Sequence, residues 1–385
     1  PSPFQEAAVL TIDGVGEWAT ASICYGKGKE FKILRELKFP HSLGLLYSAV
    51  TYYCGFKVNS GEYKLMGLAP YGIHGSAAVK RYEDLIKQHL VSIKDDGSIW
   101  LNQEYFNYAT GLRMVHDAKW ETLFGFKRRD GESLLEQHHC DFALAIQNVT
   151  EEVVVKMAAE AQRLTGSPYL CLAGGVALNC VANGKLQNTG MFREIFIQPA
   201  AGDAGGALGA ALAAHYLYFG QSRTVDRAAL DGMKGSYLGP EYSDLDIKQA
   251  ARKYGAVYEE FTDFNDLAEK TAELLAEGNV IGWFQGRMEF GPRALGARSI
   301  LGDARNSEMQ KKLNLKIKYR EGFRPFAPSV LAEEADQYFE LEGVSPYMLL
   351  VQPVRKERRN RLPDNYEELP LMEKLYYLRS DLPSI

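Results

Sequence analysis

A run of arginines interleaved with glycine and proline carries the clearest chemical signal in the sequence. It spans residues 285–299 and is followed by further basic residues between 316 and 328. Guanidinium forks match the planar oxygens of carboxylate, carbamoyl or phosphate groups. A basic patch paired with surface acids is the alternative, but the Gly, Pro and Ser interleaving indicates a rigid loop and favours an anion site. The candidate catalytic residues are Arg287, Arg293, Arg298, Ser299, Lys316, Arg320 and Arg324, and Lys318 competes with Lys316 to face the site.

Two glycine-containing segments near the N-terminus are candidate ligand loops. In the first, Asp13 follows an apolar run and is flanked by Gly14 and Gly16. Glycines let backbone N–H groups approach phosphate oxygens, and a carboxylate at a strand end can hold a metal or a water. In the second, Glu62 and Lys64 stand two apart in a predicted Gly-rich loop, where they could hold ribose hydroxyls or a phosphate. The alternatives are a simple Asp-Gly hairpin turn and a solvated surface loop.

Two further segments have the pattern of a strand, a turn and a helix start. Gly174 and Gly175 form the first turn, which ends at Asn179 and admits an adenosine or phosphate against a helix N-terminus. Asp203 opens the second helix, with glycines behind it that let a phosphate or metal come close. A tight βα turn and an ordinary N-cap are the alternatives. One βα unit separates the two segments, so they are expected to converge on one cleft face.

The elements that would position these residues follow a recognisable order. Apolar runs predict three strands of a meander, a helix capped by Ser42, a Gly-rich loop over 55–75, an insertion over about 76–132, and probable helices over 133–165. Strand, helix, strand and helix then follow to residue 220. This is the order of a ribonuclease-H-like subdomain, the half-unit of actin-like ATPases. The predicted spans are 7–12, 19–25 and 31–39 for the strands, 43–54 for the first helix, a pair of helices within 133–165, and 169–173, 176–186, 195–197 and 203–218 for the last four elements.

The remainder predicts a second α/β domain. Residues 221–243 are polar and turn-rich and are interpreted as a linker between domains 1–220 and 244–385. The second domain is predicted to begin with a helix, a strand, a helix and a strand. These four elements are expected at 244–253, 256–261, 266–277 and 280–284.

Composition limits the function classes. The 385 residues carry a formal net charge of -5, so no nucleic-acid partner is expected. No apolar run approaches the roughly 20 residues that span a bilayer, so no membrane role is expected. Five Cys without a C-x-x-C pair favour a reducing cytoplasm, and no His-x-x-x-His metal pair occurs. The chain opens without Met and ends without a closing pattern, which suggests a fragment of a longer protein.

These segments, in this order, resemble the O-carbamoyltransferase family of nodulation and antibiotic-tailoring enzymes over nearly the whole chain. The specific pieces are residues 11–17, 64–72, 174–179, 291–299 and 324–328. The resemblance implies an actin-like domain followed by a partial YrdC-like domain. It also implies two steps: the YrdC-like domain forms carbamoyl-adenylate from carbamoyl phosphate and ATP, and the actin-like domain passes the carbamoyl group to a hydroxyl acceptor.

The resemblance further implies site residues and cofactors. Asp13, Gly14, Gly16, Glu62, Lys64, Gly174, Gly175 and Asn179 would hold the adenylate. Asp203 matches the aspartate that holds an iron(II) ion or another divalent metal, whose two His ligands are expected before Pro1, and Mg²⁺ is a further candidate. The family continues past Ile385 with more residues of the carbamoyl phosphate pocket. A small-molecule hydroxyl acceptor is the expected partner, and the acceptor's identity and the oligomeric state stay open.

Two other functions compete with O-carbamoyl transfer. An actin-fold small-molecule kinase would use the regions around Asp13 and Asp203, but it has no need of an Arg-rich second domain. A tRNA threonylcarbamoyl-type transferase would bind RNA, which the acidic charge balance opposes.

Overall fold

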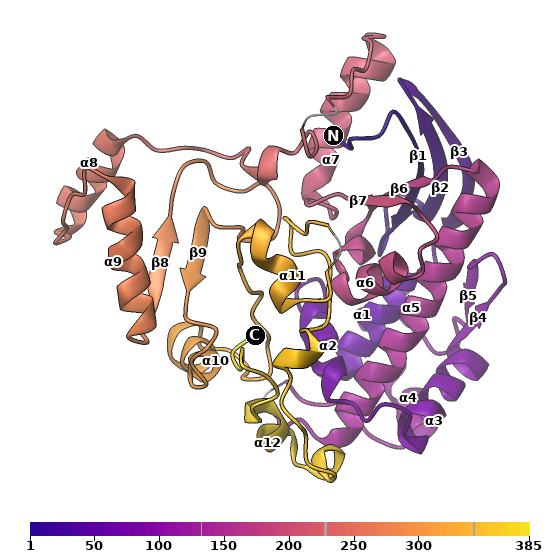
Figure 1. Cartoon of the computed structure of the whole chain (residues 1–385). Coiled ribbons are helices and arrows are strands. Elements are labelled where there is room, and N and C mark those ends of the chain that lie inside the picture. Colours follow the sequence, from indigo (N-terminus) through magenta and orange to yellow (C-terminus); the bar gives the residue numbers. More distant parts are fainter. Residues whose placement is uncertain (132, 227–228, 342) are drawn as a thin grey trace. The chain divides into compact units, whose positions relative to one another are not determined.

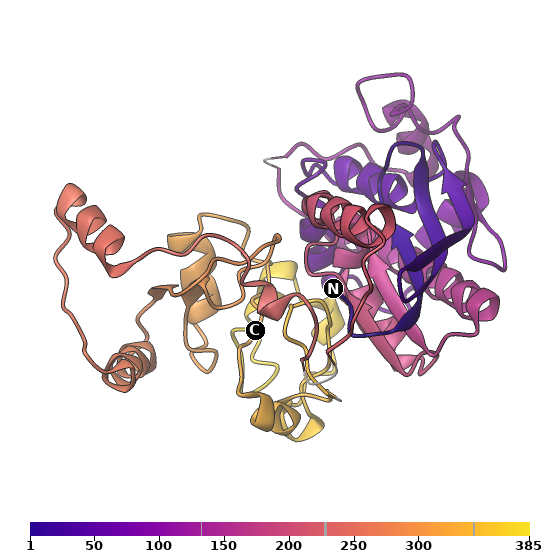
Figure 2. The same cartoon turned by 90° about the horizontal axis from the view of Figure 1, so that it is seen from above.

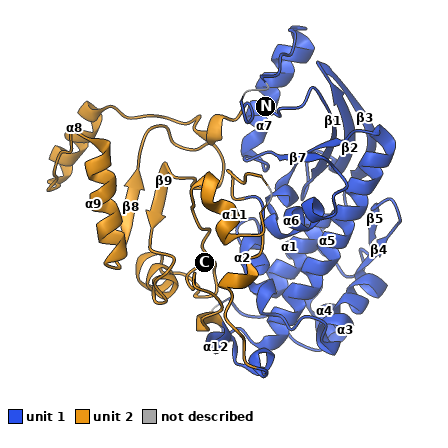
Figure 3. Ribbon diagram, in the orientation of Figure 1, with its two compact units in different colours: residues 1–232, 349–351, 364–374 blue, residues 233–348, 352–363, 375–385 orange. Residues whose placement is uncertain are grey.

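A computed structural model describes residues 1–131, 133–226, 229–341 and 343–385. Residue 132, the end of the expected insertion, and residues 227–228, within the expected linker, therefore lie outside the described residues. The chain divides into two compact units (Figure 3). The predicted domain boundaries, 1–220 and 244–385, stay predictions. Unit 1 comprises residues 1–232, 349–351 and 364–374, and unit 2 comprises residues 233–348, 352–363 and 375–385.

Unit 1 is built on a five-stranded mixed sheet, whose strands β1, β2 and β3 are indigo and whose strands β6 and β7 are pink in Figure 1. The strand order is β3-β2-β1-β6-β7, with the first three strands antiparallel and β6 and β7 parallel to β1. Alternation along β1 buries Ala8, Leu10 and Ile12 on one face, as a period of two requires. The predicted meander is confirmed. The strands are β1 (Glu6–Ile12), β2 (Ala19–Lys27), β3 (Glu30–Lys38), β6 (Tyr169–Ala173) and β7 (Glu194–Ile197).

Helices cover the face of the sheet that carries these buried residues. Helix α1 (Leu43–Tyr53) begins at Ser42, whose hydroxyl accepts from the Leu45 N–H at 3.0 Å, so the predicted N-cap is confirmed. The stretch 133–165 was predicted to hold two helices, and this prediction is wrong. It forms one 29-residue helix, α5 (Gln137–Thr165), because buried residues recur along its whole length and no Gly or Pro interrupts it.

The insertion packs against these helices through aromatic side chains. Trp120 and Phe124 of helix α4 are buried against Tyr53 of α1 and Phe142 of α5, with Trp120 5.1 Å from Tyr53 between ring centroids. The predicted helix near residue 77 is confirmed. The insertion contains α3 (Ala77–Leu85), the π-helical turn η2 (Ile86–Leu90), β4 (Val91–Ile93), β5 (Ile99–Leu101) and α4 (Asp117–Phe124).

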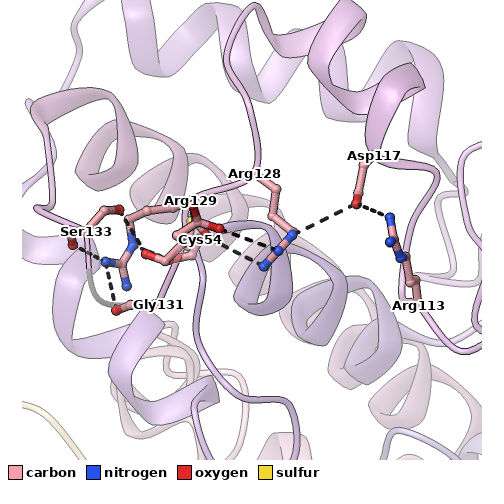
Figure 4. Close-up of polar contacts among 8 residues, drawn as sticks. Cys54, Arg113, Asp117, Arg128, Arg129, Gly131 and Ser133 are labelled. Atoms are coloured by element: carbon pink, nitrogen blue, oxygen red, sulfur yellow. Dashed lines mark hydrogen bonds and ion pairs between the residues drawn. The ribbon is translucent and has the colours of Figure 1, made fainter.

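A buried arginine fastens the end of the insertion to α1 (Figure 4). The Arg129 Nε donates to the Cys54 carbonyl at 2.7 Å, and its Nη1 donates to the carbonyls of Gly131 and Ser133. Its neighbour Arg128 lies 4.0 Å from the carboxylate of Asp117. A buried guanidinium surrounded by backbone carbonyls holds a loop in place and is unlike a ligand-binding cation.

The segment 55–75 contains helix where a loop was predicted. It contains helix α2 (Glu62–Leu68) and the 3-10 turn η1 (Ala69–Tyr71). The glycines of this segment indicated a loop, but the Glu62 carboxylate accepts from the Gly61 N–H and stabilises the start of α2. The predicted helix at 176–186 is a 3-10 turn, η3 (Gly175–Leu178), followed by α6 (Cys180–Asn188). After β7 come α7 (Ala204–Ala213) and the π-helical turn η4 (Ala214–Tyr218), as predicted.

Unit 2 has less regular structure. The predicted strand at 256–261 is wrong: this segment pairs with no strand in the described part of the chain, and Val257 is fully exposed to solvent. The segment 285–299 was predicted to be a rigid loop, but its last two residues belong to β9, which is antiparallel to β8. The longer elements are α8 (Asp244–Tyr254), α9 (Phe264–Ala276), β8 (Ile281–Phe284) and β9 (Arg298–Leu301), drawn in orange in Figure 3.

The short elements of the chain's last third lie outside these four: η5 precedes α8 and the others follow β9. Within the described residues, no helix is long and apolar enough to cross a membrane. Figure 2 gives a second view of the elements. The short elements are η5 (Lys234–Ser236), α10 (Met309–Lys311), η6 (Lys312–Ile317), η7 (Ala332–Glu334), α11 (Ala335–Tyr338), η8 (Lys356–Arg358), η9 (Tyr366–Glu368) and α12 (Leu371–Tyr376).

Candidate functional site

Three turns meet where the parallel strands of unit 1 end. The Asp13 Oδ1 accepts from the Gly14 N–H at 2.8 Å and from the Gly175 N–H at 3.2 Å, which joins the turn after β1 to the turn after β6. The Gly174 N–H donates to the Ala201 carbonyl at 2.9 Å, which adds the loop after β7. The convergence of the Asp13, Gly174 and Asp203 segments follows from the parallel order of β1, β6 and β7.

Gly174 allows the closest of these approaches. Its φ is +89°, and a Cβ at this position would lie 2.2 Å from the Ile12 carbonyl oxygen. Any other residue would both strain the backbone and push the β6 turn away from β1. Packing of the β6 turn against β1 therefore explains why a glycine stands at position 174, without reference to a ligand.

A cavity of about 740 Å³ opens beside the three turns, all of its lining residues belonging to unit 1. A volume of this size is typical of small-molecule sites. A Cβ added at the lining residues Gly202 or Gly206 would meet no atom within 4 Å, and the same is true of Gly14, which lies in the Asp13 turn but outside the lining. Packing within the chain does not require glycine at these three positions, which is the pattern expected where a ligand approaches the backbone. The lining residues that belong to the three turns are Asp13, Gly16, Gly174, Gly202, Asp203 and Gly206.

The start of α1 supports the Asp13 turn from below. The Ser42 hydroxyl lies 3.0 Å from the Asp13 carbonyl and 2.6 Å from the Gly14 carbonyl, in addition to capping the helix. A Cβ at Gly44 would lie 2.6 Å from the Asp13 carbonyl oxygen, so the helix can approach the turn only through glycine. Sequence reasoning used Ser42 as a cap alone, because nothing local to it indicates this second contact.

Five of the predicted cofactor-binding residues are not among those that line the cavity: Gly14 and Gly175, which belong to the turns that meet there, and Asn179, Glu62 and Lys64. Asn179 caps α6 through the Ala182 N–H at 3.0 Å and exchanges hydrogen bonds of 3.0 and 3.1 Å with Gln147. Glu62 accepts from the Ser48 hydroxyl at 2.7 Å and from the Asn59 and Gly61 N–H groups. The Lys64 Nζ lies 5.9 Å from the centre of the Phe56 ring. Their assignment as adenylate ligands stays a prediction.

Asn179 belongs to a buried polar network between α1, α5 and α6. The Tyr47 hydroxyl donates to the Gln147 Oε1 at 3.0 Å, and Glu151 links Gln147 to Lys185. Burial raises the pKa of Tyr47 well above its ordinary value, and the nearby Cys180, Glu151 and Glu62 raise it further. This network fixes the helices that carry the β6 turn.

A metal site is incomplete in the described residues. No group of three or more His, Cys, Asp or Glu side chains there is placed to hold a metal ion. Asp203 lines the cavity and could supply one carboxylate ligand. The residues present therefore do not by themselves fit the iron site that the resemblance implies.

In unit 2 the Arg-rich segment is wound around a buried carboxylate. The side chain of Glu289 is 0% exposed, and its Oε2 accepts from the Arg298 Nε at 2.8 Å. Its Oε1 accepts from the N–H groups of Leu295 and Ala297, each at 2.7 Å. The Ser299 hydroxyl accepts from the Gly296 N–H at 3.0 Å and closes the same loop. Glu289 was missed because a single Glu between arginines gives no sequence signal of burial.

A second cationic group surrounds a buried asparagine. Asn314 is 0% exposed, and its Nδ2 donates to the carbonyls of Gly322 at 3.1 Å and Arg324 at 2.9 Å. Its Oδ1 accepts from the Arg320 Nε at 2.6 Å. Burial, then Arg320 and Arg324, lower the pKa of Lys318. Lys318 therefore lies near these two arginines, and both Lys318 and Lys316, which belongs to η6, are exposed.

The remaining predicted catalytic residues differ in exposure, from 16% for the Arg324 side chain to 56% for that of Arg287. The Arg287 Nη1 donates to the Gly239 carbonyl at 3.1 Å, and its side chain is 56% exposed beside Glu241. Arg293 is half-buried on the loop between Gly291 and Gly296, which have φ values of +127° and +110°. Arg324 lies 3.6 Å from Glu321. Hydrogen bonds to the buried side chains of Glu289 and Asn314 thus hold the loops that carry most of these cations.

Comparison with known proteins places the chain in a family. The family model described as carbamoyltransferase N-terminus matches residues 1–212, more than half of the chain, and that described as carbamoyltransferase C-terminus matches residues 272–367. The nodulation protein NolNO of Sinorhizobium fredii is 41% identical over 94% of this chain and 50% of its own length.

Two further relatives extend the comparison. An uncharacterized protein of Synechocystis is 57% identical over 100% of this chain and 61% of its own length. The 3'-hydroxymethylcephem-O-carbamoyltransferase of Streptomyces clavuligerus is 34% identical over 58% of this chain and 39% of its own length. The chain thus spans less than two thirds of each of these relatives. With both family models matched, the chain belongs to the carbamoyltransferase family.

Proposed function

We propose that the protein carrying this chain is an ATP-dependent O-carbamoyltransferase that acts on a small-molecule hydroxyl. The observation that carries the proposal is the meeting of Asp13, Gly174 and Asp203 at one cavity, in a chain of the carbamoyltransferase family. One relative is named as an O-carbamoyltransferase of a hydroxymethyl compound, and we extend that activity to this chain. Cytoplasmic location fits the five free cysteines.

We assign the transfer step to unit 1, which we take to be the ribonuclease-H-like half of an actin-like domain. The glycine-lined turns would hold an adenylate, since Gly14, Gly202 and Gly206 leave room for a ligand against the backbone. The acceptor oxygen would add to the carbamoyl carbon, AMP would leave, and the hydroxyl would lose its proton. Asp203 stays the proposed carboxylate ligand of a divalent metal, and we assign no step of the transfer to that metal.

We assign adenylate formation to unit 2, which we take to be YrdC-like. Carbamoyl phosphate would lose phosphate to water, and the resulting carbamate oxygen would attack the α-phosphorus of ATP and expel pyrophosphate. Apart from water, every species in this step is an anion, and preorganised cations stabilise the negative charge that develops. Lys318, Arg320 and Arg324 lie together on one loop, and Arg298 is fixed on another.

Product analysis with purified intact protein tests the proposal. Incubation with ATP and carbamoyl phosphate should release pyrophosphate, and release should cease when carbamoyl phosphate is omitted. Formation of ADP in place of pyrophosphate would instead indicate a kinase. The variant Asp13→Asn should lose carbamoyl transfer to an acceptor. Asp95→Asn, an exposed acid at the β4–β5 turn, should retain it.

A further inference from the structure

The loop of residues 290–297 in unit 2 encloses the Glu289 carboxylate. Among the described residues, Arg298 is the charged side chain that contacts this carboxylate. We propose that Glu289 is a positioning residue of the anion site: it fixes this loop and holds Arg298 by the Nε edge of its guanidinium, so that the Nη edge faces the anion. The inference rests on the proposed function of unit 2. Glu289 itself does not touch substrate and acts through Arg298.

The contacts of Glu289 account for both oxygens of its side chain. One oxygen accepts from the backbone N–H groups of Leu295 and Ala297, and the other accepts from Arg298. The two backbone bonds pull the loop into a closed turn, and the side chain is wholly excluded from solvent. A carboxylate that accepts this many bonds in a buried position sets the geometry of its donors, because leaving any of them unpaired carries a large free-energy cost.

Neighbouring hydrogen bonds hold the base of the same loop. The Phe290 N–H donates to the Ser236 carbonyl at 2.7 Å, and the Tyr237 hydroxyl donates to the Leu295 carbonyl at 2.7 Å. The Gln285 N–H donates to the Ala297 carbonyl at 3.2 Å. The loop is thus fastened at its start, its centre and its end. The remaining freedom belongs to the Arg298 side chain, and the contact with Glu289 removes it.

The Arg298 side chain lies between the loop and solvent. It is 35% exposed, so it is anchored at one edge and still reachable. Guanidinium groups bind carboxylate and phosphate through paired N–H groups on one edge. The Arg298 Nε donates to the Glu289 carboxylate and its Nη2 donates to the Glu289 carbonyl at 3.5 Å, so the outer Nη edge is left with a fixed direction. An arginine oriented in advance loses less side-chain entropy on binding than a mobile one.

The charge state of Glu289 is stable over the working pH range. Burial on its own would raise the pKa of the Glu289 carboxyl, but the hydrogen bonds from Arg298 and from the backbone N–H groups outweigh it and lower the pKa to about 2. The ion pair with Arg298 therefore persists wherever the enzyme works. A glutamine at position 289 has the same shape as the glutamate, but it keeps only one acceptor oxygen and carries no charge.

A kinetic comparison of variants tests the inference. In carbamoyl phosphate-dependent pyrophosphate release, E289Q should raise KM for carbamoyl phosphate about tenfold or more, since a charge-assisted hydrogen bond is lost. It should change kcat less than KM, because Glu289 does not contact the reacting atoms. E289D should recover part of the loss. Glu260→Gln breaks an exposed ion pair with Lys248 in the same unit and should leave KM unchanged.

A double-mutant cycle separates positioning from general support of the fold. If Glu289 acts through Arg298, then E289Q combined with R298Q should have nearly the same KM as R298Q alone. Hydrogen exchange at the Leu295 and Ala297 amides should accelerate in E289Q and stay slow in Glu260→Gln. Unchanged KM in E289Q, or fully additive effects in the cycle, would overturn the inference.

The result also distinguishes this inference from the proposed function. If the unmodified protein releases no pyrophosphate with carbamoyl phosphate, the proposed function fails. Hydrogen exchange and an anion-protection assay with carbamoyl phosphate alone, read as slower exchange around Arg298, still test the positioning role. If the unmodified protein is active and E289Q matches it in both KM and exchange, only the positioning role fails.

Discussion

The two units hold their candidate site residues by opposite means. In unit 1 the ends of β1 and β6 bring Asp13 and Gly174 together, and backbone groups make the contacts between the turns. In unit 2 most of the candidate cations lie on loops, although Arg298 begins β9 and Lys316 belongs to η6. Two buried polar side chains, Glu289 and Asn314, hold those loops in shape. Unit 1 depends on the absence of side-chain atoms where turns meet, whereas unit 2 depends on the presence of specific polar atoms.

This difference predicts which substitutions are harmful. Adding a methyl group at a close approach should damage unit 1, since a tightly packed backbone cannot move away cheaply. Removing a carboxylate or an amide should damage unit 2, because several buried backbone groups would lose their partners together.

The largest effect is expected for Gly174→Val. The new Cβ would lie 2.2 Å from the Ile12 carbonyl oxygen, at a φ of +89° that valine rarely adopts. We expect a loss of about 3 kcal/mol or more in the unfolding free energy of unit 1, measured by denaturant titration. Gly206→Ala is the matched control, because its Cβ meets no atom within 4 Å. It should unfold normally but bind ATP more weakly, and normal stability of Gly174→Val would refute the packing argument.

The next effect is expected for Asn314→Ala in unit 2. The substitution leaves the Gly322 and Arg324 carbonyls and the Arg320 Nε without their present partner, so we expect a loss of about 2–4 kcal/mol. Faster hydrogen exchange between residues 318 and 324 should accompany it. Asn265→Ala, at an exposed position of α9, should change neither quantity. Wild-type exchange in Asn314→Ala would show that the loop does not depend on this side chain.

The same contrast explains what the sequence could predict. The strand order around Asp13 and Gly174 followed from apolar runs and turn residues, because these patterns are local and the parallel order then fixes which turns meet. The single long helix α5 was predicted as two, since a change in its buried face resembles a break. The strand predicted at 256–261 pairs with no strand in the described part of the chain, and its apolar residues do not alternate with polar ones.

The supports of unit 2 could not be predicted in the same way. Glu289 and Asn314 resemble ordinary surface residues in the sequence, and only their contacts with residues 6 to 10 positions away make them structural. The same holds for Asn179 and Glu62, whose hydrogen-bonding groups are engaged by the protein itself. Long-range burial of a polar group leaves no periodic pattern in the chain.

Acid should affect the two units in different pH ranges. Burial lowers the pKa of His139 in unit 1 to about 4, with His138 and Arg129 adding to the effect. Between the ordinary value of about 6.5 and about 4 the unfolded chain binds more protons, so unit 1 should lose stability, by at most about 3 kcal/mol, as pH falls through this range. The pKa of Glu289 is about 2 in the folded protein, so its protonation should destabilise unit 2 only as pH falls from about 4.5 towards 2.

Thermal unfolding followed separately for each unit by hydrogen exchange would measure this difference. In His139→Gln the stability of unit 1 should fall less between pH 6.5 and 4, and the stability of unit 2 should not change. His74→Gln, at an exposed position, should retain the decline. A decline of equal size in His139→Gln would mean that other groups of unit 1 take up the protons.

The smallest effect is expected for Ser42→Ala, which links helix capping to the site. The hydroxyl caps α1 and also contacts the Asp13 and Gly14 carbonyls, so stability should fall by about 1–2 kcal/mol. Ser76→Ala removes only the cap of α3 and serves as the control. If Ser42 supports the Asp13 turn, Ser42→Ala should weaken ATP binding more than Ser76→Ala at equal loss of stability. Equal ATP affinities in the two variants would show that the turn keeps its shape through Gly44 and the strand end alone.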